Sequence, residues 1–88
     1  MYQVDWSETS TAIDLCEIYV EHVQHRAEIM HACKRIDKIL AHSGPTAGTV
    51  ISEEGLAKLQ SEPLQVMYEF AENKIEIQTV KWIGLSST

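Results

Sequence analysis

Residues 64–82 read LQVMYEFAENKIEIQTVKW, and the first half of this stretch alternates between apolar and other side chains. The alternating apolar residues are Leu64, Val66, Tyr68 and Phe70. Such a two-residue period is typical of a β-strand with one buried face. Residues 72–74 (Glu-Asn-Lys) interrupt the pattern and predict a tight turn, in which Asn73 tolerates positive φ. The stretch therefore predicts two antiparallel strands.

The second of these strands changes its pattern partway along. Ile75 and Ile77 share one face, whereas Val80 and Trp82 lie on the opposite parity. After Thr79 we therefore expect either a β-bulge or a strand that is buried on both faces. Upstream, residues 56–60 predict a further short strand before Pro63, which completes a three-stranded antiparallel meander.

The beginning of the chain predicts another strand. Tyr2, Val4 and Trp6 alternate with polar residues, so residues 2–6 have one apolar face. Ser7, Thr9 and Ser10 follow, and their hydroxyl groups suit the capping of a helix.

Residues 8–42 contain no glycine or proline, and their apolar residues recur at spacings of three and four. The first part of this helical stripe is Ala12, Cys16, Tyr19, Val20, Val23, Ala27 and Met30. Ile36, Ile39 and Leu40 continue it. One helix of roughly 34 residues would be about 50 Å long, which overhangs a domain with a radius of gyration near 12 Å. We therefore predict a helical hairpin with its break near His22–Arg26.

Gly44 and Pro45 are expected to end the second helix, and residues 43–55 are predicted to form a loop. The predicted fold is α+β with the order β-α-α-β-β-β. It has an N-terminal strand, a helical hairpin and a three-stranded antiparallel meander, with the helices packed on one face of a small sheet.

The composition limits the function. The chain has 88 residues, 44% of them hydrophobic, and thirteen acids against seven Lys and Arg give a net charge of −6. Phosphate groups repel such a chain on average, so we expect binding neither to free nucleic acid nor to an anionic membrane. Two cysteines, Cys16 and Cys33, are too few for a disulfide scaffold. Without a basic and apolar leader, a cytoplasmic location is expected.

In its order of elements, the chain resembles the RelE/ParE toxin superfamily. The first strand and helix are matched by residues 2–9, Asp14-Leu15 and Ile18-Tyr19, the second helix by residues 34–40, and the closing strands by residues 55–59, 64–70 and 75–77. The resemblance covers nearly the whole chain and implies a single RelE/ParE-like domain over residues 1–88.

The resemblance implies a toxin of a bacterial toxin–antitoxin, or plasmid stabilisation, system. Its expected partner is a cognate antitoxin whose helix or strand wraps the toxin. RelE-like members cleave messenger RNA on the ribosome, whereas ParE-like members act on DNA gyrase. The long helical pattern is slightly more similar to the ParE-like members.

Ribonuclease members of the family place a lysine and an arginine on successive strands and an Arg, His or Tyr after the last strand. Here Lys58 matches the lysine, Gln65 takes the place of the arginine, and the region around Leu85 contains none of the three residue types. A neutral amide cannot clamp a phosphate as a guanidinium does. We therefore expect partner binding rather than standard RNA cleavage. Alternatively, Lys58 serves only to discourage pairing at a sheet edge.

Lys34, Arg35 and Lys38 form a basic stripe on the second predicted helix and are candidates for docking an acidic partner segment. With Asp37 among them, the same stripe also fits an ordinary solvated face. We expect no cofactor, and no metal site either, since His22 and His25 are the only helical histidine pair and four converging ligands are lacking.

Other functions remain open at this point. One is an endoribonuclease that acts on the ribosome with relocated catalytic groups and retains only Lys58. Another is an inactive relative of the toxins. The third is an acidic homodimerisation module whose helices pack across a two-fold axis.

Overall fold

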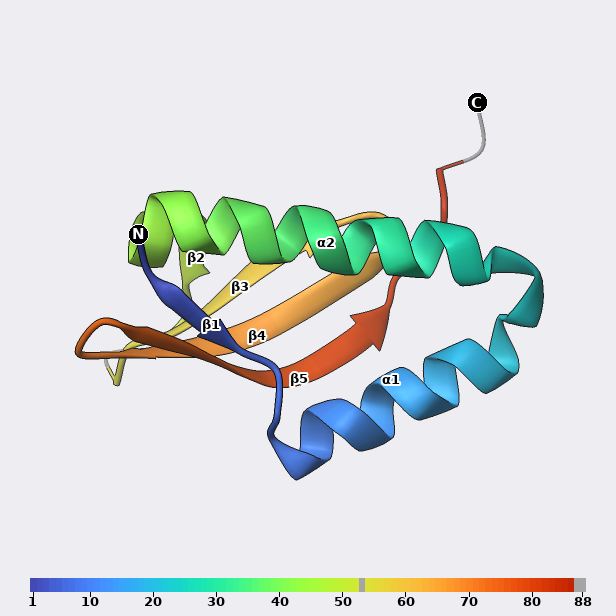
Figure 1. The fold of residues 1–88 in the computed structure, drawn as a ribbon, viewed down its shortest axis with the longest axis horizontal. Helices are drawn as coiled ribbons and strands as arrows, with labels where there is room; N and C mark the ends of the chain where they lie inside the picture. Colours follow the sequence, from blue (N-terminus) through green and yellow to red (C-terminus); the bar gives the residue numbers. More distant parts are fainter. Residues whose placement is uncertain (53, 87–88) are drawn as a thin grey trace.

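The computed structural model describes residues 1–52 and 54–86, without the side chains of Pro45 and Ala71. Over these residues the fold is α+β, as predicted, and the helices pack against the sheet (Figure 1). In chain order the elements are β1 (Gln3–Asp5), α1 (Thr9–Glu21), the 3₁₀ turn η1 (Val23–His25), α2 (Arg26–Ser43), the 3₁₀ turn η2 (Gly44–Thr46), β2 (Thr49–Val50), β3 (Leu56–Ser61), β4 (Leu64–Ala71) and β5 (Lys74–Trp82).

The described residues form a five-stranded sheet in the order β1-β5-β4-β3-β2. β3, β4 and β5 make the predicted antiparallel meander, and β1 joins it in parallel alongside β5. The prediction of a loop over residues 43–55 is wrong at Thr49–Val50, which pair with Lys58 and Ala57 as β2. Two β-branched residues are too short a run to show a strand period in the sequence. Residue 53 of that segment lies outside the described residues.

β5 contains the predicted bulge. Met67 of β4 pairs with Thr79, whereas the next residue, Tyr68, pairs with Ile77, so Gln78 is the extra residue. This insertion moves the buried positions from Ile77 to Val80 and explains the change of parity in the sequence. The β4–β5 turn also lies where it was predicted, but the residue with positive φ is Glu72, at 58°, rather than Asn73.

The helical hairpin breaks within the predicted segment, between Glu21 and Arg26. Its bend is held against the far end of β5 by an aromatic contact. The imidazole ring of His22 stacks on the indole of Trp82 with 3.7 Å between ring centroids and 10° between ring planes. In Figure 1 the two helices spread apart from this bend, α2 across the sheet and α1 along β5.

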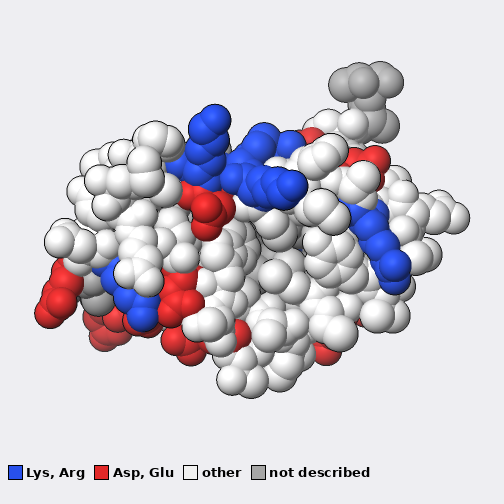
Figure 2. All heavy atoms as spheres, in the orientation of Figure 1, with Lys and Arg blue, Asp and Glu red and all other residues white. Residues whose placement is uncertain are grey.

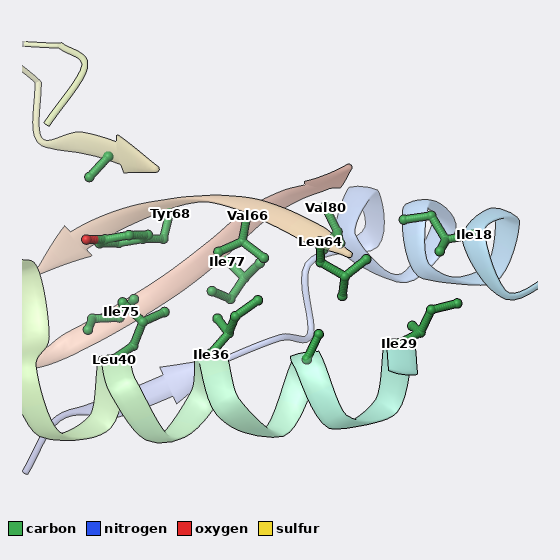
Figure 3. Packing of buried hydrophobic residues seen from close by; sticks show 12 residues of the cluster. Ile18, Ile29, Ile36, Leu40, Leu64, Val66, Tyr68, Ile75, Ile77 and Val80 are labelled. Carbon is green, nitrogen blue, oxygen red and sulfur yellow. The ribbon is translucent and has the colours of Figure 1, made fainter. Parts of the chain in front are cut away.

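The core lies between α2 and the sheet (Figure 3). Ile29, Ile36 and Leu40 have no exposed surface and follow one face of α2 at helical spacings. They face the buried side chains of β4 and β5, namely Leu64, Val66, Tyr68, Ile75, Ile77 and Val80. Burying one large aliphatic side chain contributes roughly 1.5–3 kcal/mol, so this layer is the main attachment of α2.

Polar contacts attach α1 along the edge of β5. The pairing of β1 with β5 stops at Glu76, and α1 covers the edge that follows. The hydroxyls of Ser10 and Thr11 donate to the carbonyl oxygens of Gln78 and Ile77 at 2.6 and 2.7 Å, and Asp14 accepts from the Val80 N–H at 2.9 Å. Side chains of α1 thereby satisfy the backbone groups of β5 that β1 leaves unpaired.

The expected hydroxyl caps are therefore not formed at the start of α1. Glu8 occupies the N-cap position without a side-chain hydrogen bond. Ser7 bonds the Asp5 carboxylate instead, and Ser10 is bonded to β5.

Candidate partner-binding site

A groove of about 500 Å³ lies between the two helices. It is lined by Trp6, Leu15, Tyr19, Cys33, Lys34 and Asp37. Leu15 and Tyr19 are one turn apart on α1, and Cys33 and Asp37 are one turn apart on α2, so each helix presents a pair of side chains to the groove. Its volume is within the range of ligand pockets, and its lining is mostly apolar.

Trp6 enters this groove from the segment between β1 and α1. Its indole N–H donates to the Asp37 carboxylate of α2 at 2.9 Å. The contact fixes the ring beside α2 and gives the polar N–H a partner, which leaves the apolar ring surface available.

Two titratable side chains of the groove, Cys33 and Tyr19, have raised pKa values and are neutral at neutral pH. Burial raises the pKa of the Cys33 thiol. Burial is also the main cause that raises the pKa of the Tyr19 hydroxyl, with Cys33 adding to it and Arg26 opposing it. Because a thiol reacts as a thiolate, a raised pKa makes Cys33 a poor nucleophile at neutral pH. The groove is thus suited to apolar contact rather than to covalent chemistry.

Ile36 and Leu40 of the predicted apolar stripe are in the core, whereas the first part of the stripe lies outside it. Ala12, Cys16, Val20, Val23, Ala27 and Met30 are all exposed, and only Tyr19 of the first part of the stripe is half-buried. The residues that attach α1 to the sheet are instead Thr11 and Ile18. The hairpin therefore carries a second apolar face, which continues outward from the groove and which we call the hairpin face.

The three basic candidates of the second helix are separated by the structure. Lys34 lines the groove, and Lys38 is exposed on the same helix. Arg35 is engaged elsewhere, since its guanidinium donates to the Ser61 hydroxyl at 3.0 Å and to the Glu62 carbonyl at 2.7 Å. Figure 2 shows basic residues gathered over α2, above a broad area of uncharged atoms.

Lys58 lies apart from this groove. It is on β3, next to the buried Ala57, and therefore points to the face of the sheet that the helices leave open. β2 covers this part of β3, so Lys58 is not at an outer edge. It contributes to a polar hollow of about 270 Å³, together with Thr49 and Gln60.

Gln65, which takes the place of the family's strand arginine, shares the open face with Lys58. Its side-chain carbonyl accepts a hydrogen bond from the Gln60 amide at 2.7 Å. Its partner on β5 is Lys81, an exposed cation that the sequence reasoning missed. Residues paired across two strands point to the same face, so only the strand register, and no local motif, could have identified Lys81.

The segment around Leu85 is fastened to the β3–β4 turn. The Ile83 N–H donates to the Pro63 carbonyl at 2.8 Å, and both the N–H and the hydroxyl of Ser86 donate to the Glu62 carboxylate. These bonds lower the pKa of Glu62, with the Ser86 hydroxyl as the largest cause. Residues 87 and 88 lie outside the described part of the chain.

Residues 1–52 and 54–86 contain no group of three or more His, Cys, Asp or Glu side chains placed to hold a metal ion. Within the same residues, neither helix has the length and apolar character needed to cross a membrane.

Trp6, Tyr19 and Asp37 were not predicted as site residues, because Trp6 was expected on the apolar face of the first strand, Tyr19 in the helical stripe and Asp37 on a solvated face. The four-residue spacing of Leu15 with Tyr19 and of Cys33 with Asp37 places each pair on one face of a helix, but it does not reveal that the two faces meet.

The chain was compared with protein-family models, with curated proteins and with solved structures, and none of them matches it.

Proposed function

We propose that this chain is the toxin-like component of a bacterial toxin–antitoxin system and that it acts in the cytoplasm by binding protein partners. The observation that carries the proposal is the apolar groove between α1 and α2, bordered by Lys34. The resemblance to the RelE/ParE superfamily supplies the class of partner, and the observed element order is consistent with it.

The groove suits an amphipathic helix or an extended segment of an antitoxin. Such a segment would bury its apolar side chains against Trp6, Leu15 and Tyr19. Acidic residues beside those side chains would approach Lys34 and Lys38 on α2. Partly buried charge pairs of this kind mainly contribute specificity and a faster association rate.

The open face of the sheet gives less support to RNA cleavage of the standard kind. Cleavage through the 2′-hydroxyl needs proton transfer and cations that stabilise the charge on the phosphorane. Where a guanidinium would serve, Gln65 offers an amide that is already bonded to Gln60. If the chain is toxic, a non-nucleolytic target such as DNA gyrase fits this face better.

The proposal is tested by induced expression in a bacterial host, with and without the protein encoded by the adjacent reading frame. We expect growth arrest by the wild type and relief of that arrest by co-expression. The Lys34→Glu/Lys38→Glu variant should remain toxic but should no longer be relieved. Lys81→Glu, on the open face, is the matched control and should be relieved like the wild type.

Two results would contradict the proposal. Normal growth with abundant folded protein would argue against a toxin. If the adjacent protein relieves the toxicity of Lys34→Glu/Lys38→Glu as well as that of the wild type, the groove is not where that protein binds.

A second candidate is the ribosome-dependent endoribonuclease with relocated groups, and the position of Lys81 beside Gln65 favours it. Lys58 and Lys81 place two cations on the open face, on strands that flank β4. If this candidate is right, the wild type cleaves messenger RNA on the ribosome, and neither Lys58→Ala nor Lys81→Ala does so. Under the first proposal, both variants arrest growth as strongly as the wild type at equal soluble level.

A further inference from the structure

The two helices carry opposite charges. α1 has three acids, Asp14, Glu17 and Glu21, and neither Lys nor Arg. α2 has four basic residues, Arg26, Lys34, Arg35 and Lys38, against two acids. The net charge is therefore −3 on α1 and +2 on α2, although the whole chain carries −6.

Asp14 and Arg35 are hydrogen-bonded within the chain, whereas four of the other charges form no ion pair among the described residues. Among the described residues the ion pairs join His25 to Glu28 and Lys74 to Asp5 and Glu76. Glu17 and Glu21 of α1, and Lys34 and Lys38 of α2, take part in none of these pairs. All four side chains are exposed. The groove lies between the two helices, so Glu17 and Glu21 belong to the helix on one side of it and Lys34 and Lys38 to the helix on the other.

The hairpin face between these charges exposes large apolar side chains. The exposed fraction is 53% for Ile13, 68% for Val20, 55% for Val23 and 47% for Met30. All four lie on the helical hairpin, with the groove lined by Trp6, Leu15 and Tyr19 between its two helices. A contiguous apolar area with charged borders is typical of a protein interface.

We propose that in the absence of another partner a second copy of this chain covers the hairpin face, in a two-fold symmetric dimer. A two-fold axis that lies between the two copies and runs along the helices sets the acidic α1 of each copy against the basic α2 of the other. Both charge contacts are then favourable at once, which is the self-complementarity that an isologous interface requires. The apolar strip is buried between the four helices.

Charge is the reason to prefer a second copy. An acidic segment, such as the one proposed for the antitoxin, offers opposite charge to α2 alone, and a basic segment offers it to α1 alone. A second copy of the hairpin offers basic residues to α1 and acidic residues to α2. The inference does not depend on the proposed toxin function, because it concerns the chain alone.

The first test measures the mass of the purified chain in solution by sedimentation equilibrium over a range of concentrations. We expect a monomer–dimer equilibrium. Val20→Asp should raise the dimer dissociation constant at least tenfold, because it places a charge in the apolar strip. The matched control is Val50→Asp on β2, since Val50 is exposed to 65%. This control should leave the dissociation constant unchanged.

The second test exchanges the charges. Glu17→Lys/Glu21→Lys makes both helices basic, and Lys34→Glu/Lys38→Glu makes both acidic. Each variant alone should be monomeric, because each contact would then join like charges. An equimolar mixture of the two should form heterodimers, because every contact between them joins opposite charges. Far-UV circular dichroism on each variant verifies that the chain is folded.

The outcomes separate cleanly. Recovery of dimers in the mixture supports the inference even if one single variant is less stable. A wild type that stays monomeric at about 100 μM, well above the concentrations at which standard-size interfaces associate, overturns it. A dimer that is as sensitive to Val50→Asp as to Val20→Asp also overturns it, because the interface would then lie elsewhere. None of these results bears on toxicity in cells.

Discussion

At the level of single residues, Thr11 shows how the sheet edge is completed. Its side chain is fully buried, and its hydroxyl donates to the Ile77 carbonyl just beyond the end of the β1–β5 pairing. A buried carbonyl without a partner costs the desolvation of that group. The Thr11 hydroxyl therefore donates the hydrogen bond that a backbone N–H would donate if β1 were longer.

Thr11→Val should lower the free energy of unfolding by about 1–3 kcal/mol, because valine keeps the shape of threonine but leaves the Ile77 carbonyl unsatisfied. Denaturant unfolding followed by circular dichroism measures the difference. Thr9→Val, at an exposed position of the same helix, is the control and should change the stability little. Equal stability of the two variants would show that the Ile77 carbonyl finds another partner.

Asp5 makes the stability depend on acid pH. Hydrogen bonds from the Ser7 hydroxyl and backbone N–H, followed by the contact with Lys74 at 3.0 Å, lower its pKa from 3.8 to about 2. A carboxyl whose pKa is lower in the folded state stabilises the fold above its unfolded pKa. That contribution is lost as the pH falls from about 4, the unfolded value, towards 2.

Asp5→Asn should therefore flatten the pH dependence of the unfolding free energy between about pH 4 and pH 2. Denaturant titrations at several pH values measure it. Glu69→Gln serves as the control, since it removes an exposed carboxylate of β4. An unchanged slope in Asp5→Asn would mean that the Ser7 and Lys74 contacts do not persist in solution.

At the level of elements, the sequence predicted those that repeat a period over many residues. The alternation at 64–70, the parity change after Ile77 and the helical spacing over 8–42 each led to a correct element. β2 could not be predicted, because two residues contain no period and only the register with β3 defines the strand.

The sequence located the helices correctly, and Ile36 and Leu40 of the predicted stripe meet the sheet from α2, but it did not reveal which face of α1 does so. The stripe from Ala12 to Met30 was the stronger apolar pattern, yet it is exposed. α1 turns towards β5 with Ser10, Thr11 and Asp14, because an unpaired strand edge requires hydrogen-bonding side chains. The groove follows from this orientation, so its residues could not be found from the spacing of apolar residues alone.

The end of α2 depends on a close approach between backbone and ring. Gly44 has φ = 61°, and a Cβ added there would collide with the ring of Tyr2. Gly55 also has positive φ, at 92°, but a Cβ there meets only the Phe70 carbonyl at 3.9 Å. The two glycines thus share the backbone requirement and differ in the space around them.

Gly44→Ala should therefore lower the free energy of unfolding by about 1–3 kcal/mol more than Gly55→Ala does. Both variants introduce backbone strain, but only Gly44→Ala also introduces a collision with the ring of Tyr2. Thermal or denaturant unfolding of the pair gives the difference. Equal losses would show that the ring of Tyr2 moves aside at no cost.

Tyr68 connects the core to the segment before β2. Its ring is fully buried, and its hydroxyl accepts a hydrogen bond from the Gly48 N–H at 3.0 Å. Burial raises the pKa of this hydroxyl, so it stays protonated at neutral pH. Its role is therefore structural.

Tyr68→Phe should cost about 1 kcal/mol and should release the Gly48 amide to faster hydrogen exchange, because that N–H loses its acceptor. Exchange monitored by NMR measures the effect at a single amide. Tyr2→Phe is the matched control, since its ring packs edge-on against Phe70, and it should leave the Gly48 amide protected. Protection that survives in Tyr68→Phe would indicate an alternative acceptor.

At the level of the whole molecule, the sheet and the hairpin present two surfaces of different character. The open face of the sheet carries Lys58, Gln65 and Lys81, whereas the hairpin face is apolar between charged borders. Both proposals on protein binding use the hairpin face, so an antitoxin and a second copy of the chain would exclude each other.

Adding the antitoxin to the dimeric chain should therefore yield a complex in which no two copies of the chain are joined through their hairpins. Sedimentation velocity during such a titration should show the dimer disappearing as the complex forms. Glu17→Lys/Glu21→Lys, which disfavours the dimer and changes no residue proposed to contact the antitoxin, should remove the concentration dependence of antitoxin binding. A complex in which the homodimer persists intact would place the antitoxin on another surface.

The parallel pairing of β1 with β5 also affects how the protein is made. Residues 3–5 find their partners only at residues 74–76, and α1 is anchored to residues 77–80. During synthesis the first strand and helix leave the ribosome long before their partner strand is translated, and contacts so distant in sequence form slowly. Until then their apolar side chains are open to chaperones and proteases. β1 and α1 can therefore take their places in the sheet only after β5 has left the ribosome.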